Sequence, residues 1–114
     1  MAPPTKLAVA TGSVTRLVKE EASYHKEIVQ QHERIKKLEA SEGDNNKEYT
    51  LRQEKQALQE TQNVFPAVRA RIEQAIEKLE GELEDSKESE GNAEEIKKAE
   101  DALAAGKKVI AEAA

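Results

Sequence analysis

Two histidines, many carboxylates and one glycine-lysine-lysine segment are the groups in this sequence that could do chemistry. His25 and His32 are the only histidines, and they stand seven positions apart. On a helix this spacing puts both rings on one face but about 10 Å apart along the axis. Metal ligands on a helix need a spacing of three or four residues, so one ion cannot bridge the two rings. We predict two solvated surface histidines and no metal site.

The remaining groups do not predict catalysis. The abundant acidic residues belong to charged helix faces, whereas general acid-base catalysis needs a cleft that perturbs a carboxylate. Gly106-Lys107-Lys108 looks like a phosphate-binding loop but lacks the upstream glycine, the following Ser or Thr and the preceding strand. The absence of cysteine excludes disulfides and thiol catalysis. We therefore predict that the protein is not an enzyme and takes no cofactor.

Composition indicates helices that work through their surfaces. Charged residues make up 36%, hydrophobic residues 37% and aromatic residues only 3%, a mixture typical of coiled coils and helical bundles. So few aromatics argue against a deep ligand pocket. A net charge of −5 disfavours nucleic acid as a partner. With no membrane-length apolar run and no signal-peptide core at the N-terminus, we expect a soluble intracellular protein that binds no membrane.

Apolar residues recur in three long runs, at the alternating three- and four-residue steps of packed helices. The runs cover residues 7–38, 51–83 and 93–113, and only Glu21 and Gln31 interrupt the first. Three amphipathic helices joined by short loops predict an all-α fold, an antiparallel up-down-up three-helix bundle that is spectrin-repeat-like. We expect a single domain over the whole chain.

The predicted helices span about residues 5–41, 46–85 and 92–113. Gly43 has the residue type that takes a left-handed position after the first helix. Pro66 lies inside the second helix, where a proline removes a backbone hydrogen bond at a cost of about 3 kcal/mol. Because the apolar register continues past it, we predict a kink, which is either merely tolerated or shapes a docking surface.

Polar residues mark the turns and caps between these helices. Asn45 with Glu48 and Asn92 with Glu95 have the three-residue spacing of a capping box. Residues 85–91 are polar without an apolar period and predict the second turn.

Helix lengths suggest where a partner binds. The third helix is too short to cover all of the other two, which leaves residues 26–62 as a bare two-helix hairpin with a thin apolar seam. An apolar strip without a third helix over it is a place where a partner or a second copy of the chain can dock.

Charge is unevenly distributed along the chain. Residues 6–38 carry seven basic and four acidic side chains, a net charge of +3, and residues 77–95 carry two basic and nine acidic ones, a net charge of −7. Two interpretations stay open. Either these are solvated faces with pairs such as Glu33 to Lys37 and Glu94 to Lys98, or the basic first helix steers an acidic partner.

Several segments resemble the tubulin-folding cofactor A family. They are Thr11-Gly12-Ser13-Val14-Thr15-Arg16-Leu17-Val18-Lys19-Glu20 with Tyr24, Lys26-Glu27 and Gln30-Gln31, then Gly43-Asp44-Asn45, Gln56-Ala57-Leu58-Gln59-Glu60, Pro66 and Arg71-Ile72-Glu73 with Ala75. The resemblance covers about residues 7–83 and fades after Glu84. Phe65 before the proline and the alanine-rich tail depart from the family pattern.

The resemblance implies a cytoplasmic, cytoskeleton-associated chaperone, either a monomer or a homodimer, that needs no nucleotide. Such a protein captures β-tubulin released by the cytosolic chaperonin and holds it for the other tubulin-folding cofactors. The alternative is a structural or oligomerising coiled-coil module. Tyr24 has a second interpretation, as a core residue. Carried over to matching positions, the resemblance gives these partner-binding candidates: Lys19, Glu20, Tyr24, Lys26, Glu27, Gln30, Gln31, Gln59, Glu60 and Pro66.

Overall fold

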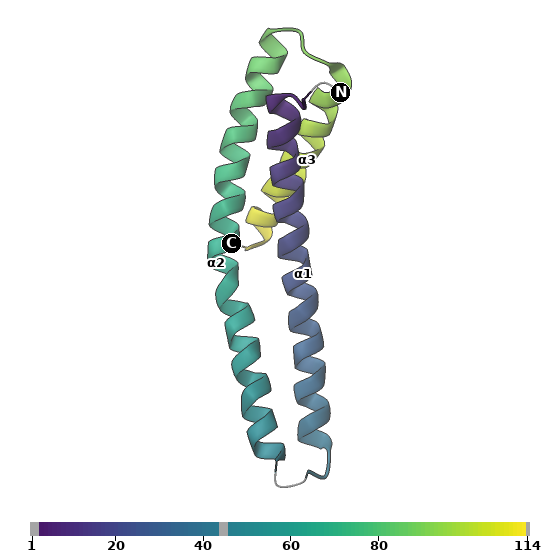
Figure 1. Cartoon of the computed structure of the whole chain (residues 1–114), viewed down its shortest axis with the longest axis vertical. Coiled ribbons are helices and arrows are strands. Elements are labelled where there is room, and N and C mark those ends of the chain that lie inside the picture. The colour runs from purple at the N-terminus through teal and green to yellow at the C-terminus, as the bar shows by residue number, and fades with distance from the viewer. Residues whose placement is uncertain (1–2, 44–45, 114) are drawn as a thin grey trace. The chain divides into compact units, whose positions relative to one another are not determined.

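Three α-helices make up the protein in the computed structural model, which describes residues 3–43 and 46–113 (Figure 1). α1 spans Lys6–Ala40, α2 spans Lys47–Glu88 and α3 spans Ala93–Ala113. No strand occurs within the described ranges. The predicted all-α class is confirmed.

Thr5 is the N-cap of α1. Its Oγ1 accepts a hydrogen bond of 3.0 Å from the Ala8 N–H, and its carbonyl accepts one of 3.0 Å from the Val9 N–H. A threonine in this position satisfies backbone donors that the first helical turn would leave unpaired. Residues 11–13 therefore lie inside the helix and do not begin it.

The loop after α1 uses Gly43 in a way that the sequence did not predict. No glycine among the described residues has a positive φ, so the expected left-handed cap is wrong. Instead, the side chain of Lys47 occupies the place where a Cβ on Gly43 would lie. The Lys47 Nζ donates hydrogen bonds of 3.2 Å to the Glu39 carbonyl and 2.6 Å to the Ser41 carbonyl, which satisfies the end of α1. The predicted cap Asn45 lies outside the described residues.

The turn between α2 and α3 is shorter than predicted, because α2 continues to Glu88. The left-handed residue here is Glu90, with a φ of 55°. A non-glycine residue in this region costs about 1–2 kcal/mol. The 2.7 Å hydrogen bond from the Gly91 N–H to the Ser86 carbonyl closes the turn around it.

Asn92 caps α3 as its spacing to Glu95 predicts. Its Oδ1 accepts hydrogen bonds from the N–H groups of Glu94 at 2.9 Å and Glu95 at 3.2 Å. The Glu95 side chain has a different partner from the one in a capping box, since its Oε1 accepts a 2.8 Å hydrogen bond from the Thr5 hydroxyl. One threonine thus caps α1 and holds the first turn of α3.

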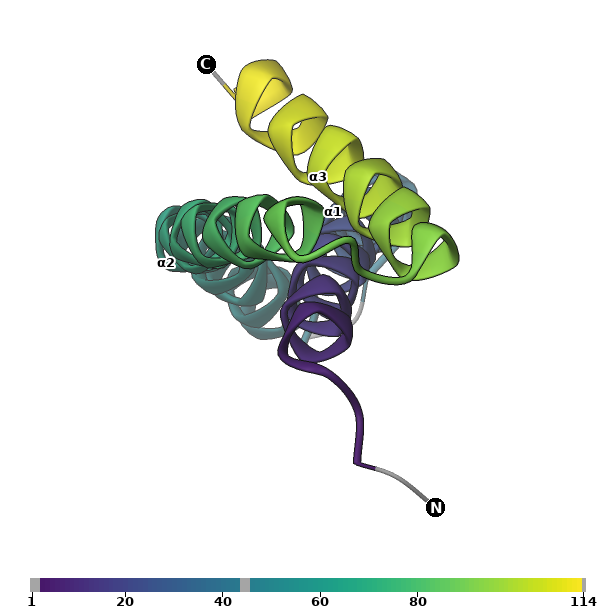
Figure 2. The same cartoon turned by 90° about the horizontal axis from the view of Figure 1, so that it is seen from above.

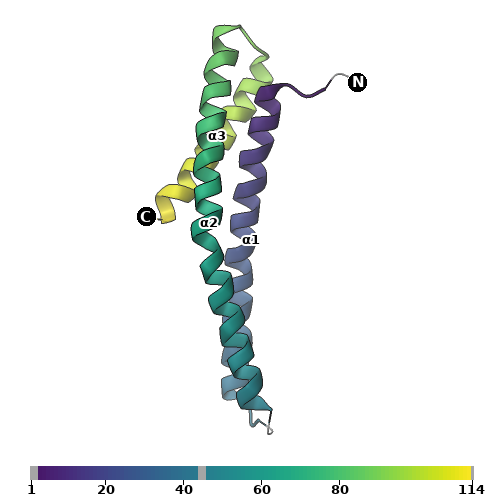
Figure 3. The same ribbon diagram turned by 60° about the vertical axis from the view of Figure 1, so that its left-hand side comes forward.

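The chain divides into two compact units. Unit 1 comprises Met1–Glu20 and Ala67–Ala114, and unit 2 comprises Glu21–Pro66. Within unit 1, α3 runs obliquely past the segments of α1 and α2 (Figures 2 and 3). All three helices contribute to its apolar core, whose buried residues are Leu7, Ala10, Val14, Leu79, Leu83, Ala99 and Ala102.

Small residues let α3 approach its neighbours in unit 1. A Cβ added to Gly106 would lie 3.1 Å from Ile76 Cδ1 and 3.1 Å from Val14 Cγ1. This close approach explains a buried glycine inside a helix, where it costs about 1 kcal/mol relative to alanine. Ala99 and Gly106 of the third apolar run are buried, and Ala102 is buried beside them, whereas Ala93 at the start of the run is exposed.

Unit 2 contains segments of α1 and α2 only, and its interior is partly polar. Its buried apolar residues are Ile35 and Phe65. Beside them, Glu21, Gln31 and Thr61 are buried as well. Glu21 and Gln31, the two residues that interrupt the first apolar run, therefore lie inside the unit at the positions where that run predicts buried residues.

The two glycines Gly106 and Gly81 form a matched pair for a packing test. Gly81 is exposed within α2, and an added Cβ would meet no atom within 4 Å. We predict that Gly106→Leu lowers the free energy of unfolding by about 1–3 kcal/mol, because the leucine overpacks the core. Gly81→Leu should raise it by up to about 1 kcal/mol through helix propensity. Urea denaturation followed by circular dichroism measures both, and equal stabilities would contradict this packing.

Candidate functional site

Most of the candidate partner-binding residues lie at the surface. Lys19 and Glu20 belong to unit 1, and the others belong to unit 2. Glu20 and Tyr24 are half-buried, and Gln31 is only 3% exposed, so the structure does not place the Gln31 side chain on the expected surface. The exposed candidates are Lys19, Lys26, Glu27, Gln30, Gln59, Glu60 and Pro66.

The α2 candidates belong to a face of side-chain amides. Gln59 Nε2 donates a 3.0 Å hydrogen bond to Asn63 Oδ1, and Gln56 Nε2 donates a 3.4 Å one to Glu60 Oε1. Both pairs have the four-residue spacing that brings side chains together on a helix. The result is a polar surface with donors and acceptors held along the helix.

Two exposed apolar residues in unit 2 were missed by the sequence reasoning. Val29 is 58% exposed and Tyr49 is 60% exposed. Val29 adjoins the candidate Gln30 on α1. Its position outside the heptad seam is the signal that could have found it, since an apolar residue off the seam faces solvent.

His25 is a surface residue as predicted, with its side chain 55% exposed, but the ring has two partners. Its Nε2 lies 2.9 Å from Glu21 Oε2, in a hydrogen bond that becomes an ion pair when the imidazole is protonated. The ring also packs on Phe65, with centroids 4.5 Å apart. Tyr24 meets the same phenyl ring edge-on at 6.2 Å. Tyr24 and His25 thus contact the buried Phe65 of unit 2, whereas His32, which is exposed as well, has no ring contact or ion pair with the described residues.

A second polar contact crosses the interior of unit 2. Gln31 Nε2 donates a 3.1 Å hydrogen bond to Thr61 Oγ1, and the Thr61 hydroxyl donates a 3.0 Å one to the Ala57 carbonyl. The Gln31 Oε1 is buried and has no partner among the described residues. A buried polar atom without a partner costs about 1–3 kcal/mol. The contact between Gln31 and Thr61 fixes which residues of α1 and α2 face each other, but it lowers the stability of the packing between them.

Most of the ion pairs among the described residues join two helices, whereas His25–Glu21 and Lys108–Glu112 run along a single helix. The expected pairs Glu33 to Lys37 and Glu94 to Lys98 are not formed within the described residues. Exposed ion pairs contribute only about 0.2–1 kcal/mol each. The pairs that join α1 and α2 in unit 2 are Arg34–Glu54 at 3.3 Å and Lys55–Glu39 at 3.7 Å. Pairs between helices in unit 1 include Arg71–Glu20 at 3.8 Å and Lys107–Glu80 at 3.0 Å.

Metal-binding clusters and membrane-spanning helices are both absent from the part of the chain that the structure describes. No group of three or more His, Cys, Asp or Glu side chains is placed to hold a metal ion there. None of its helices is both long and apolar enough to cross a membrane.

The class defined by this fold is an all-α protein whose candidate residues lie on helix surfaces. Its family follows from similarity to known proteins. The sequence profile of the family Tubulin binding cofactor A matches residues 2–103. Tubulin-specific chaperone A of Mus musculus and that of Homo sapiens are each 39% identical over 94 residues, which cover 82% of this chain and 83% of the relative. The protein of the same name from Gallus gallus is 38% identical over 98 residues, 86% of this chain and 87% of the relative.

The chain belongs to the tubulin binding cofactor A family. The resemblance seen in the sequence is confirmed, and it extends beyond Glu84, where the recognisable segments ended. No solved structure gives a significant match to the chain.

The two histidines allow a controlled test of the polar contacts in unit 2. His25→Ala removes the ring partner of the buried Glu21 carboxylate and the contact with Phe65. We predict a loss of about 1–3 kcal/mol in the free energy of unfolding. The control His32→Ala should stay within about 0.5 kcal/mol of the wild type, because that ring is exposed. Equal values for both variants in chemical denaturation would refute the structural role of His25.

Proposed function

We propose that the chain is a tubulin-folding chaperone that captures β-tubulin folding intermediates and holds them for assembly of the αβ-tubulin heterodimer. The observation that carries this proposal is the 39% identity to Tubulin-specific chaperone A over 82% of the chain. The other tubulin-folding cofactors would receive the client, so their contact with this chain is indirect.

We propose that the three helices act as one domain, an antiparallel up-down-up bundle with a kink at Pro66. Contacts inside unit 2 support the antiparallel direction. Gln31 pairs with Thr61 and Arg34 with Glu54, so positions rise along α1 as they fall along α2. Pro66 lies inside α2, where a proline removes one backbone hydrogen bond and typically bends the helix.

The client surface in this proposal comprises the exposed polar residues of α1 and α2. A surface of amides and charges makes many modest contacts, so it can retain a client without holding it irreversibly. The basic side chains of α1 steer an acidic client and set the rate of encounter. Exposed Val29, next to Gln30, adds apolar area to this surface.

The proposed activity is binding alone. Affinity comes from helix faces, with no nucleotide, cofactor or catalytic step. The protein acts in the cytoplasm, in association with the cytoskeleton, as a monomer or a homodimer.

Retention of newly folded tubulin tests this function. Immobilised protein should retain β-tubulin from a chaperonin folding reaction. We predict that Lys19→Glu combined with Lys26→Glu reduces retention about tenfold, because two exposed attractive charges become repulsive, while helicity is unchanged. Lys78→Glu with Lys97→Glu makes the same change in net charge at exposed positions of α2 and α3 and should retain β-tubulin like the wild type.

Two results would count against the proposal. Absence of retained β-tubulin would remove the chaperone function, and concentration-dependent large oligomers in sedimentation would then favour the structural coiled-coil module. Equal losses in both double variants would show a general charge effect and would remove the basic face of α1 from the client surface.

A further inference from the structure

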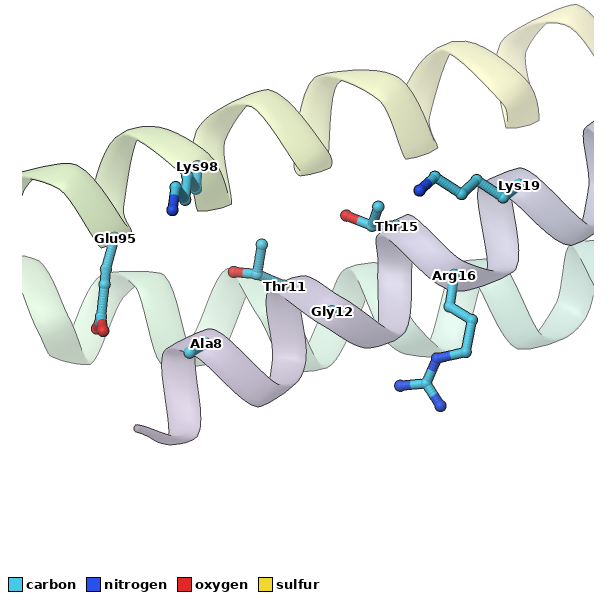
Figure 4. Close-up of a pocket in the computed structure, with 8 residues that line it drawn as sticks. All are labelled: Ala8, Thr11, Gly12, Thr15, Arg16, Lys19, Glu95 and Lys98. Atoms are coloured by element: carbon cyan, nitrogen blue, oxygen red, sulfur yellow. The ribbon is translucent and has the colours of Figure 1, made fainter. Parts of the chain in front are cut away.

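A groove in unit 1 lies between the N-terminal part of α1 and the first turns of α3. It has a volume of about 450 Å³. Its α1 side is formed by Ala8, Thr11, Gly12 and Thr15, which are small residues. Figure 4 shows both threonine side chains on the side of α1 that faces α3.

Three cations surround this groove, although the chain as a whole is acidic. Arg16, Lys19 and Lys98 take part in no ion pair or hydrogen bond with the described residues. In Figure 4, Lys19 extends along the α3 side of α1, and Arg16 leaves α1 on the other side. Glu95 stands at one end, with its carboxylate bonded to Thr5. Unpaired cations in a concave surface attract anionic groups.

The hydroxyls offer acceptors as well as donors. Thr11 Oγ1 donates its proton to the Leu7 carbonyl at 2.8 Å, so only its lone pairs remain for a ligand. Thr15 has no bond to the described residues, so its hydroxyl is available in either role. A peptide main chain supplies N–H donors for Thr11, whereas an ionised carboxylate or a phosphomonoester dianion supplies none. This favours a peptide over a simple anion.

The spacing of these groups matches an extended chain. Thr11, Thr15 and Lys19 follow one another at four-residue intervals, which is about 6 Å per step along a helix. In an extended peptide, residues on one side repeat at about 6.6–6.8 Å. A compact anion needs donors that converge on one point, whereas these are spread along a line.

Gly12 keeps the middle of the groove open. It is exposed inside α1, where glycine costs about 1 kcal/mol relative to alanine. Packing within the protein does not require it, because an added Cβ would meet no atom within 4 Å and its φ is not positive. A bare backbone on a surface allows another chain to approach closely.

We propose that this groove binds an extended acidic peptide segment of a partner protein, with acidic side chains on Lys19 and Lys98 and its main chain over Gly12. The inference goes beyond the proposed function, because it holds for any partner with such a segment and does not require tubulin.

Binding of a designed peptide tests the proposal. The probe is a short fluorescein-labelled peptide in which Glu alternates with Ala, and its control has Gln in place of Glu. Fluorescence anisotropy at low salt should show binding of the Glu peptide only. Lys98→Glu should weaken binding about tenfold, whereas Lys97→Glu, an equal charge change outside the groove, should leave it within about twofold.

Glycine variants separate binding from stability. Gly12→Ala should raise the thermal midpoint through helix propensity and yet weaken peptide binding several-fold. Gly81→Ala, at the other exposed helical glycine with open space around it, should raise the midpoint and leave binding unchanged.

Three results would overturn the proposal: equal binding of the Glu and Gln peptides, unchanged binding in both Gly12→Ala and Lys98→Glu, or complete displacement of the peptide by inorganic phosphate at matched ionic strength. β-Tubulin retention is tested with a different ligand. Gly12→Ala and Lys98→Glu change no residue of the proposed client surface on α1 and α2, so failure of the groove proposal would leave the proposed function standing.

Discussion

Gly106 of α3 approaches Val14 of α1 and Ile76 of α2 so closely that one added carbon would lie 3.1 Å from each. The other buried residues of α3 are alanines, so this helix contributes proximity more than side-chain area. The apolar area comes from α1 and α2, whose Val14, Ile72 and Leu79 are fully buried. Close packing of this kind has no room for water and little tolerance for added volume. The groove beside Gly12 depends on it, because α3 forms the opposite wall.

In unit 2, buried polar residues take a larger part in the interior than they do in unit 1. Its seam includes Glu21, Gln31 and Thr61, and one buried oxygen of Gln31 has no partner among the described residues. Hydrogen bonds across such a seam select one register but add little net stability, since the unfolded chain bonds to water equally well. Regions with few buried apolar contacts open at lower free energy than the core of a protein. Under the proposed function this property would suit unit 2, because helices that open easily can adapt to an incompletely folded client.

Apolar periodicity predicted the three helices because the spacing of apolar residues along a helix depends only on which side of that same helix is buried. Periodicity says nothing about which polar residue fills a gap in the seam, so Gln31 was assigned to the surface although its register placed it inside. Contacts between distant residues were also out of reach. His25 meets Phe65, and the Thr5 hydroxyl meets Glu95, only because the chain folds back. The groove is another such feature, since its walls are far apart in the sequence.

Unit 1 is tightly packed, whereas unit 2 has polar residues in its seam, so the two units should differ in the free energy of local unfolding. Native-state hydrogen exchange measures this difference residue by residue. Amides beside Val14 and Leu79 should exchange only through global unfolding, whereas those beside Gln31 and Leu58 should exchange through openings of about 1–3 kcal/mol lower free energy. The same exchange free energy at all four positions would contradict the account.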